Sequence, residues 1–295
     1  MIKAHCKIEE VLLQQIEEAL YEIAPHNWIL HFNLSTGESF LDGYFGDSFL
    51  AEESQKELFY SAEIVKIPKL LISELDDEDW VNSYKKHFHP WSVGKFHWVP
   101  VWHKKSYVIP RDNFKLYLDP GMAFGTGNHE TTKLCLEAIV ELNEKIPNNL
   151  KHSFLDIGCG SGILALTASI LGFKEITAID NDPLAIKVSR ENADLNDIDF
   201  VQFKTDDLDT LTGNTKYNLI VANIQADILQ KNAQTLVTLI NNDGELLLSG
   251  ILSNECEDLV LHFKAILQTL GIENKIVVKE MNDWSLVRIK LIDIN

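Results

Sequence analysis

Three alternating glycines at the end of an apolar stretch are the residues of this chain most suited to ligand chemistry. Residues 154–162, Phe-Leu-Asp-Ile-Gly-Cys-Gly-Ser-Gly, read as a buried strand that turns into a helix. Glycines at such a turn let the backbone approach a ligand closely, because they carry no Cβ. The next apolar stretch ends in Asp180, and an acidic side chain there accepts hydrogen bonds from ribose hydroxyls. An ordinary strand-to-helix turn has similar glycines, so Asp180 is the residue that favours a nucleoside cofactor.

Two residues beside the glycines distinguish between kinds of nucleoside cofactor. The dinucleotide fingerprint has a small residue where this chain has Ile163, and it leaves the helix N-terminus open to a pyrophosphate. Asp156 places a carboxylate before the glycines, where it would repel a pyrophosphate and attract the cationic end of a methionine moiety. The pattern is similar to motif I of class I methyltransferases that use S-adenosylmethionine. We therefore expect Asp156, Gly158, Gly160 and Asp180 to contribute to cofactor binding.

An amide at the end of another predicted strand is a candidate for binding an amine. Residues 219–222 are apolar, and Asn223 follows them. Ligands of α/β folds bind outside the carboxyl ends of strands, where an amide oxygen can accept a hydrogen bond from an amine and orient its lone pair. Residues 224–226 depart from the Pro-Pro-aromatic sequence of enzymes that methylate adenine or glutamine amides, which disfavours a planar amine. The alternative is a turn residue at a strand end.

Residues 119–132 form a loop rich in glycine and threonine before a predicted helix at 133–143. Such a loop offers hydrogen-bond donors and can lie against a ligand. Asn128 or Thr131 as the N-cap of the helix is the alternative, although a cap needs fewer residues. His129 lies in this loop, where it could be catalytic or could position the loop.

The elements that must position these residues alternate between strands and helices. Strands are predicted at 153–157, 175–180, 200–204, 217–222 and 245–249, and helices at 163–171, 183–195, 226–240 and 254–270. This alternation predicts a doubly wound parallel α/β sheet. Residues 275–279 and 284–291 lie too close together for a crossover helix, so they are expected to pair antiparallel.

The amino-terminal part has a different pattern. Strands are predicted at 2–8, 28–34, 39–45 and 63–67, and helices at 9–23 and 52–60. The order β-α-β-β-α-β predicts a ferredoxin-like α+β domain. We accordingly expect a substrate-recognition domain at 1–72, a linker at 73–112 and the α/β domain at 113–295.

Several segments of the carboxyl-terminal part share the pattern of a single enzyme family. They are residues 119–132, the glycine motif at 154–162, Asn192-Ala193, residues 221–224 and residues 248–252. Together they resemble the methyltransferases of large-subunit ribosomal protein eleven, and Asp79-Trp80 and residues 88–90 add to the likeness. Gln225 occupies a position where that family often has a Leu, which blurs the detail of the substrate.

The resemblance implies a class I methyltransferase with a Rossmann-like seven-stranded sheet and S-adenosyl-L-methionine as cofactor. By position, it implies that Thr132, Gly158, Asp180 and Asn223 bind this cofactor. The implied reaction is in-line methyl transfer to lysine ε-amines and the N-terminal α-amine of that ribosomal protein, with Asn223 and His129 as catalytic candidates. The alternatives are a related lysine methyltransferase acting on a different protein and a non-catalytic adenosine-nucleotide-binding module.

Bulk properties exclude more than they select. A formal net charge of -18 disfavours a surface for nucleic-acid phosphates. The chain has no run of apolar residues long enough to cross a bilayer and begins without a signal-peptide pattern, so we expect a cytoplasmic protein that works as a monomer. The 4 cysteines lack a paired spacing. His87, His89, His97 and His103 lack accompanying carboxylates, so we expect them to pack and expect no metal site.

Overall fold

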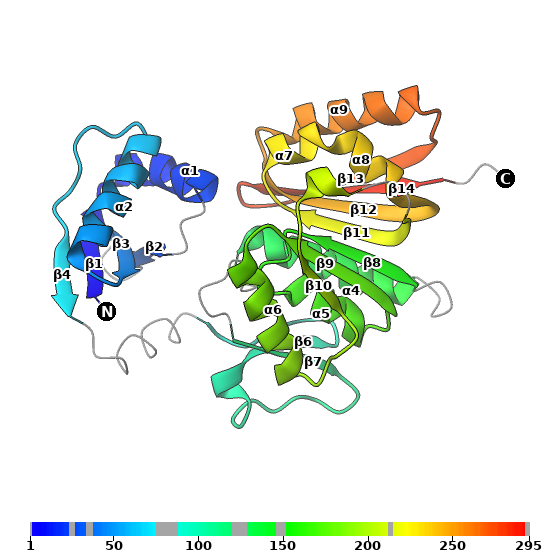
Figure 1. Ribbon diagram of the computed structural model, residues 1–295, viewed down its shortest axis with the longest axis horizontal. Coiled ribbons are helices and arrows are strands. Elements are labelled where there is room, and N and C mark those ends of the chain that lie inside the picture. Colours follow the sequence, from blue (N-terminus) through cyan, green and yellow to red (C-terminus); the bar gives the residue numbers. More distant parts are fainter. Residues whose placement is uncertain are drawn as a thin grey trace. The chain divides into compact units, whose positions relative to one another are not determined.

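A computed structural model describes residues 2–23, 27–33, 38–74, 88–119, 129–145, 152–211 and 215–292 of the chain. It divides the chain into two units, Met1–Phe88 and His89–Asn295. Figure 1 shows the helices and strands of both units along the sequence.

The first unit is a four-stranded sheet covered by two helices. Its elements are β1 (Ile2–Ile8), a 3-10 turn (Glu10–Leu12), α1 (Leu13–Ile23), β2 (Trp28–Asn33), β3 (Glu38–Phe45), α2 (Ser48–Ser61) and β4 (Leu71–Glu74). The sheet order is β2-β3-β1-β4, and each neighbouring pair runs antiparallel. Alternate residues of β1, Ala4, Cys6 and Ile8, are buried in the core. The predicted ferredoxin-like arrangement is confirmed.

The predicted strand at 63–67 is wrong, because these residues end α2. Glu63 has a φ of 55°, and Ile64 N donates to Phe59 O at 2.9 Å, which closes the helix with a left-handed cap. Ile64 is buried as the apolar partner of this cap, whereas Val65 is 98% exposed. The apolar pattern at 63–67 therefore serves a helix end, and the strand lies at Leu71–Glu74.

The second unit contains a seven-stranded sheet between two layers of helices (Figure 1). Its elements are α4 (Glu130–Lys145), β8 (Ser153–Ile157), α5 (Ile163–Ile170), β9 (Glu175–Asp180), α6 (Pro183–Leu195), β10 (Gln202–Thr205), a 3-10 turn (Leu208–Thr210), β11 (Tyr217–Asn223), α7 (Ala226–Lys231), α8 (Ala233–Thr238), β12 (Ile240–Leu252), α9 (Cys256–Thr269), β13 (Asn274–Met281) and β14 (Trp284–Leu291). The order is β10-β9-β8-β11-β12-β14-β13, and β14 runs antiparallel to both β12 and β13. The predicted doubly wound sheet with an antiparallel ending is confirmed.

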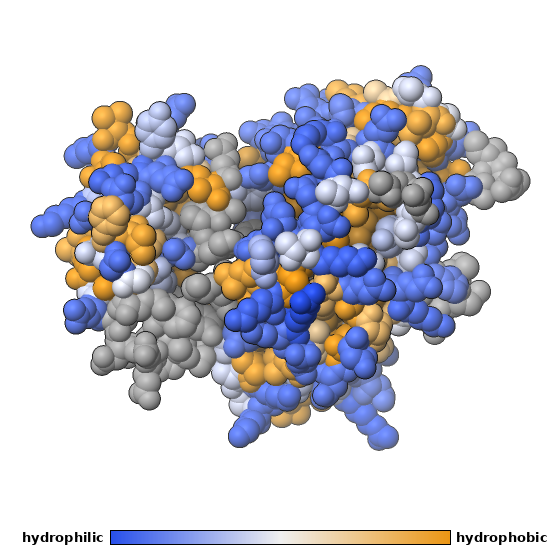
Figure 2. Space-filling view, viewed as in Figure 1, coloured by the Kyte–Doolittle hydropathy of each residue, from blue (hydrophilic) through white to orange (hydrophobic). Residues whose placement is uncertain are grey.

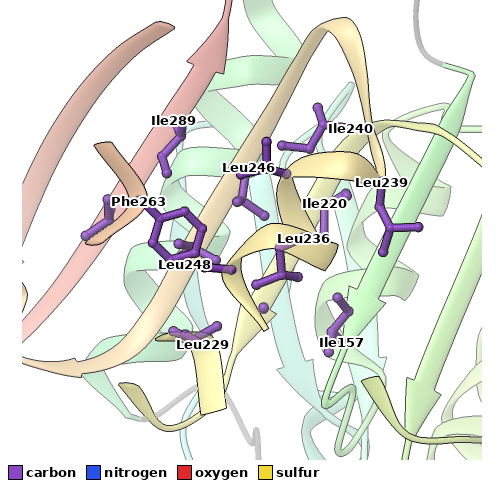
Figure 3. Close-up of a cluster of buried hydrophobic side chains, with 14 of the residues drawn as sticks. Ile157, Ile220, Leu229, Leu236, Leu239, Ile240, Leu246, Leu248, Phe263 and Ile289 are labelled. Atoms are coloured by element: carbon purple, nitrogen blue, oxygen red, sulfur yellow. The ribbon is translucent and has the colours of Figure 1, made fainter. Parts of the chain in front are cut away.

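The core beneath α7, α8 and α9 fixes the carboxyl ends of the central strands. Ile157, Ile220 and Leu248 of the sheet pack with Leu236 and Phe263 of the helices, as Figure 3 shows. The single helix predicted at 226–240 is two helices, α7 and α8, because the chain leaves helical geometry at the cap residue Asn232. The carboxyl ends of β8 and β11 lie side by side, at the point where the strand order reverses.

A small sheet that the sequence did not predict belongs to the second unit. It consists of β5 (Trp91–Val93), β6 (Phe96–Pro100) and β7 (Phe114–Leu118), in the order β5-β6-β7. A 3-10 turn, Val101–His103, follows β6. Trp98 Nε1 of β6 donates to Thr167 Oγ1 of α5 at 2.9 Å. Part of the expected linker at 73–112 is thus folded, while residues 75–87 lie outside the described residues.

No helix in the described ranges combines the length and the apolar character needed to cross a bilayer. Hydrophilic residues cover most of the face shown in Figure 2, with scattered hydrophobic areas between them. This is the distribution expected for a chain with a net charge of -18.

Candidate functional site

The glycine motif forms a tight loop between β8 and α5 at the reversal of strand order. Gly158 N and Cys159 N both donate to Ile179 O of β9, at 2.9 and 3.0 Å. These two bonds hold the beginning of the loop over the ends of β8 and β9. The loop therefore lies where α/β sheets bind their ligands.

The glycines of this loop are required by backbone conformation and by space. Gly158, Gly160 and Gly162 have φ values of 69°, 51° and 78°, which side chains with a Cβ rarely adopt. A Cβ at Gly158 would lie 2.4 Å from Ile224 Cγ2. Gly158 thus packs closely against Ile224, and the predicted close approach of this backbone to a ligand stays a prediction.

Asp180 holds the glycine loop from the end of β9. Its Oδ2 atom accepts a hydrogen bond from Gly160 N at 2.8 Å, and its Oδ1 atom accepts one from Asp182 N at 3.0 Å. The side chain is half-buried. Because a carboxylate has about four acceptor positions, these two bonds leave capacity for further donors such as ribose hydroxyls. Asp180 and Gly160, both predicted site residues, are thus brought into direct contact.

Asp156 lies beneath the loop, fully buried. Its Oδ2 atom accepts a hydrogen bond from Ala165 N of α5 at 3.0 Å, while Oδ1 has no partner within the described part of the chain. Burial is the main reason that the pKa of Asp156 is raised to about 7, and the nearby charge of Asp180 adds to this rise. The carboxyl therefore anchors α5, and its expected contact with a methionine moiety stays a prediction.

Asn223 and Thr132 meet at the end of β11. Asn223 Nδ2 donates to Thr132 Oγ1 at 3.3 Å, although the residues lie 91 positions apart in the chain. Thr132 is buried in α4, and Asn223 pairs in register with Ser249 of β12. Asn223 Oδ1 is buried without a partner in the described ranges. A buried acceptor left open in this way is costly and is typical of a ligand site.

His129 lies immediately before α4, where its ring acts as a cap. Thr131 N donates to His129 Nδ1 at 3.3 Å, and that nitrogen also lies 2.8 Å from Thr131 Oγ1. The ring packs edge-on against Trp284, with centroids 4.8 Å apart, and burial lowers its pKa. His129 is therefore the N-cap of α4, and the alternative of Thr131 as the N-cap is wrong. The other candidate, Asn128, lies outside the described residues. These contacts favour a positioning role, and a catalytic role stays a prediction.

Two buried residues of α6 that were not predicted as site residues hold the back of the loop. Ser189 Oγ donates to Gly160 O at 2.7 Å, and Asn192 Nδ2 donates to Ser161 O at 3.0 Å. Both side chains are buried. Their spacing of three residues in a predicted helix places them on one face, and this polar pair on a buried face is the signal that could have identified them.

The histidines near the small sheet have structural partners. His97 is buried, with Nδ1 2.9 Å from Tyr107 Oη and Nε2 2.8 Å from Asn113 Nδ2. Within the described ranges, no three His, Cys, Asp or Glu residues are grouped so as to hold a metal ion. His87 lies outside these ranges. Cys6, Cys135, Cys159 and Cys256 are buried and free.

Taken together, the residues fit a nucleoside with a cationic group. The loop and Asp180 offer backbone proximity and acceptors for ribose. Asp156, whose pKa is raised to about 7, carries a partial negative charge beneath the same loop near neutral pH. Asn223 Oδ1 offers an open acceptor on the neighbouring strand. The arrangement can therefore bind and orient reactants.

Comparisons with known proteins find one family across nearly the whole chain. The family model described as Ribosomal protein L11 methyltransferase (PrmA) matches residues 8–291. The ribosomal protein L11 methyltransferase of Caldicellulosiruptor saccharolyticus is 40% identical over 221 residues, covering 74% of this chain and 68% of that protein. The protein of the same name from Staphylococcus carnosus is 31% identical over 281 residues, covering 91% of this chain and 82% of that protein.

A solved structure agrees with these sequence matches. The crystal structure of ribosomal protein L11 methylase from Lactobacillus delbrueckii subsp. bulgaricus superimposes with a TM-score of 0.59 and 29% sequence identity. The superposition covers 69% of this chain and 99% of that chain.

Proposed function

This chain belongs to the ribosomal protein L11 methyltransferase family, and from that premise we propose that it methylates amines of ribosomal protein L11 with S-adenosylmethionine. The acceptors are lysine ε-amines and the N-terminal α-amine. One observation supports the proposal beyond family membership. The glycine loop with Asp180 and the Thr132–Asn223 pair both lie at the carboxyl ends of the central strands.

The cofactor would be held mainly by the ends of β8 and β9. The glycine loop would lie against the nucleoside, because its three glycines adopt positive φ values and carry no side chains that would hold a ligand away from the backbone. Asp180 can accept hydrogen bonds from the ribose while it keeps its bonds to the loop. When bound, S-adenosylmethionine supplies an electrophilic methyl group on a sulfonium. Thr132 and Asn223 close the site from the other side.

The acceptor amine would meet Asn223 at the end of β11. The open Oδ1 atom can accept an N–H of the amine and so direct its lone pair toward the methyl group. A lysine amine with a pKa of ~10.4 must lose a proton first, which costs on the order of 4 to 5 kcal/mol at neutral pH. Buried surroundings and the cationic cofactor lower this pKa, so that water can take the proton.

The amino-terminal domain, expected at 1–72, would recognise the protein substrate. It has its own core of buried residues, and the chain forms a separate unit up to Phe88. Binding energy far from the reacting atoms is needed to present a flexible lysine. Deleting residues 1–72 should therefore leave S-adenosylmethionine binding in place and abolish methylation of ribosomal protein L11. Full methylation by the shortened protein would contradict this assignment.

The proposal also includes the cellular compartment and the oligomeric state of the protein. Ribosomal proteins are available for modification in the cytoplasm, and we place the enzyme there as a monomer. Size-exclusion chromatography with light scattering should give a mass near the 33.5 kDa of the chain. A stable dimer would contradict the monomer.

A transfer assay tests the function itself. The purified protein is incubated with methyl-labelled S-adenosylmethionine and ribosomal protein L11 from cells that lack the modification, and the products are mapped by mass spectrometry. Label on lysines and on the N-terminal amine supports the proposal. Label on another ribosomal protein but not on L11 supports a related lysine methyltransferase. Cofactor binding without any transfer supports a non-catalytic nucleotide-binding module.

A further inference from the structure

A row of three polar side chains begins on the buried face of α6 and ends at the C-cap of this helix. Ser189 and Asn192 lie three residues apart on one side of the helix, and Asn196, four residues further on, is the half-buried C-cap residue. Ser189 and Asn192 are 0% and 1% exposed. Buried polar groups of this kind persist where their hydrogen bonds are fully made. The partners of the row therefore show what it is for.

Asn192 uses both ends of its amide to join two separate parts of the site. Its Nδ2 atom donates to Ser161 O in the glycine loop at 3.0 Å. Its Oδ1 atom accepts from Asp119 N at 2.8 Å. Asp119 follows β7 directly and is the first residue of the segment 119–132, which the sequence indicates as a ligand loop.

The bond to Ser161 lies on the side of the loop that faces α6. Gly160 N donates to Asp180, whereas the carbonyls of Gly160 and Ser161 are both bonded by α6. A peptide group held at its carbonyl cannot rotate freely, so the contacts from α6 fix the direction in which the loop presents its N–H groups. Without Asn192, the carbonyl of Ser161 would be left buried and without this donor.

We propose that Asn192 is a positioning residue for the cofactor, holding the glycine loop and the start of segment 119–132 at a fixed separation. This inference rests on the proposed binding of S-adenosylmethionine. Asn192 does not touch the cofactor in this account. It acts through the backbone of Ser161 and Asp119, and so it sets cofactor affinity and not the methyl-transfer step.

Asn196, the C-cap residue of α6, provides a control. Its Oδ1 atom accepts from Tyr117 N at 2.8 Å, and its Nδ2 atom donates to Tyr117 O at 2.6 Å and to Asn192 O at 2.8 Å. It therefore ties the end of α6 to β7, and among the described residues its side chain makes no hydrogen bond to the glycine loop. A purely structural role would make the two asparagines equivalent in their effect on cofactor binding.

The test compares Asn192→Ala, Asn192→Asp and Asn196→Ala in the full-length protein. Titration calorimetry with S-adenosylhomocysteine should show at least about tenfold weaker binding for Asn192→Ala, and a change within about threefold for Asn196→Ala. Asn192→Asp keeps an acceptor for Asp119 N, but it places a carboxylate oxygen against Ser161 O, and the two oxygens repel each other. It should therefore lose at least as much cofactor affinity as Asn192→Ala. Thermal unfolding and circular dichroism report on folding for each variant.

Kinetics give a second readout that a structural defect would not mimic. Asn192→Ala should raise the KM for S-adenosylmethionine and leave the KM for ribosomal protein L11 within about threefold. Two results would overturn the inference and leave the proposed function intact. One is an equal loss of cofactor affinity in the Asn192 and Asn196 variants, and the other is no loss in either Asn192 variant. Failure of the wild-type protein to bind S-adenosylhomocysteine would overturn the proposed function and the inference with it.

Discussion

The carboxyl ends of β9 and β11 lie on the same side of the sheet. They differ in how many of their polar side-chain atoms already have a hydrogen-bond partner. At β9, both carboxylate oxygens of Asp180 accept hydrogen bonds from backbone amides. Ser189 of α6 donates to the carbonyl of Gly160 in the loop. At β11, Asn223 bonds Thr132 and leaves Oδ1 open. Under the proposed function, the first region would hold the cofactor, and the second would keep the Asn223 Oδ1 atom for the acceptor amine.

The largest expected effect comes from adding one methyl group at Gly158. Gly158→Ala combines a strained φ of 69° with a contact at 2.4 Å to Ile224 Cγ2, so the loop must move away from its bonded position. We expect the affinity for S-adenosylhomocysteine, measured by calorimetry, to fall about a hundredfold or more.

Gly172 is the matched control for this change. It also has a positive φ, 98°, but a Cβ there meets nothing within 4 Å. Gly172→Ala should therefore carry the backbone strain alone and keep wild-type affinity. Adding Ile224→Ala to the Gly158→Ala protein should restore part of the binding. Similar affinities for the two single variants would show that the crowding at Gly158 is irrelevant to the ligand.

Asp180→Ala should weaken cofactor binding by roughly 1 to 3 kcal/mol, because the ribose loses a charged acceptor and Gly160 N loses its partner. The measurement is the dissociation constant of S-adenosylhomocysteine in protein shown to be folded by circular dichroism. Asp182→Ala serves as control, since the Asp182 side chain accepts from Leu184 N as the N-cap of α6. An unchanged constant for Asp180→Ala would remove Asp180 from the cofactor side.

Asp156 should make the stability of the ligand-free protein depend on pH. Its folded-state pKa of about 7 lies above the ordinary value of 3.8, so the folded state binds the proton more tightly than the unfolded state does. The resulting stability is fully present below pH 3.8 and is lost as pH rises to 7. Between roughly pH 5.5 and 7.5 the free energy of unfolding should fall by about 2 kcal/mol from this group.

Asp156→Asn tests this pH dependence, because its amide oxygen can still accept from Ala165 N. Urea unfolding at several pH values should show a smaller decline for Asp156→Asn than for the wild type. The exposed Asp243→Asn controls for the change in charge. Parallel pH profiles for wild type and Asp156→Asn would mean that the Asp156 carboxyl titrates normally in the fold.

The smallest effect is expected from Thr132→Val, which removes one hydroxyl at nearly constant volume. Asn223 would lose its bond to Thr132 Oγ1, so the amide would be less well oriented. Cofactor affinity and transfer rate should each fall by less than about tenfold, as for one hydrogen bond between neutral groups. A loss as large as that of Gly158→Ala would show that the hydroxyl itself is a major ligand of the cofactor.

The fold was predictable where each element carries its own signal. The bounds of β8 and β14 agree with the prediction, because apolar runs bounded by turn residues mark both strands. The strand predicted at 63–67 failed since a helix cap also buries an apolar residue, Ile64. The sheet of β5, β6 and β7 was missed, although Gly94-Lys95 between Val93 and Phe96 is a two-residue hairpin signal.

The site was predictable where its residues form a local motif. The glycines and Asp180 follow from spacing alone, since strand ends place them together. The contact between Asn223 and Thr132 joins residues 91 positions apart. The strand end alone indicated Asn223, whereas Thr132 was singled out only by the resemblance to a family. Asn192 was missed as a site residue because its contacts span 31 and 73 positions, and no local pattern states which backbone atoms a buried amide will bond.

One measurement tests the division between the two strand ends most directly. Single-turnover methylation of ribosomal protein L11 is followed at saturating S-adenosylmethionine in the wild type, Asp180→Ala and Asn223→Ala. Uniform loss of cofactor binding is overcome by saturation, so Asp180→Ala should regain a rate within about threefold of wild type. Asn223→Ala should stay slower by about tenfold or more, since no added cofactor replaces the open Oδ1 atom. Wild-type turnover by Asn223→Ala, together with an uncorrected defect in Asp180→Ala, would contradict the account.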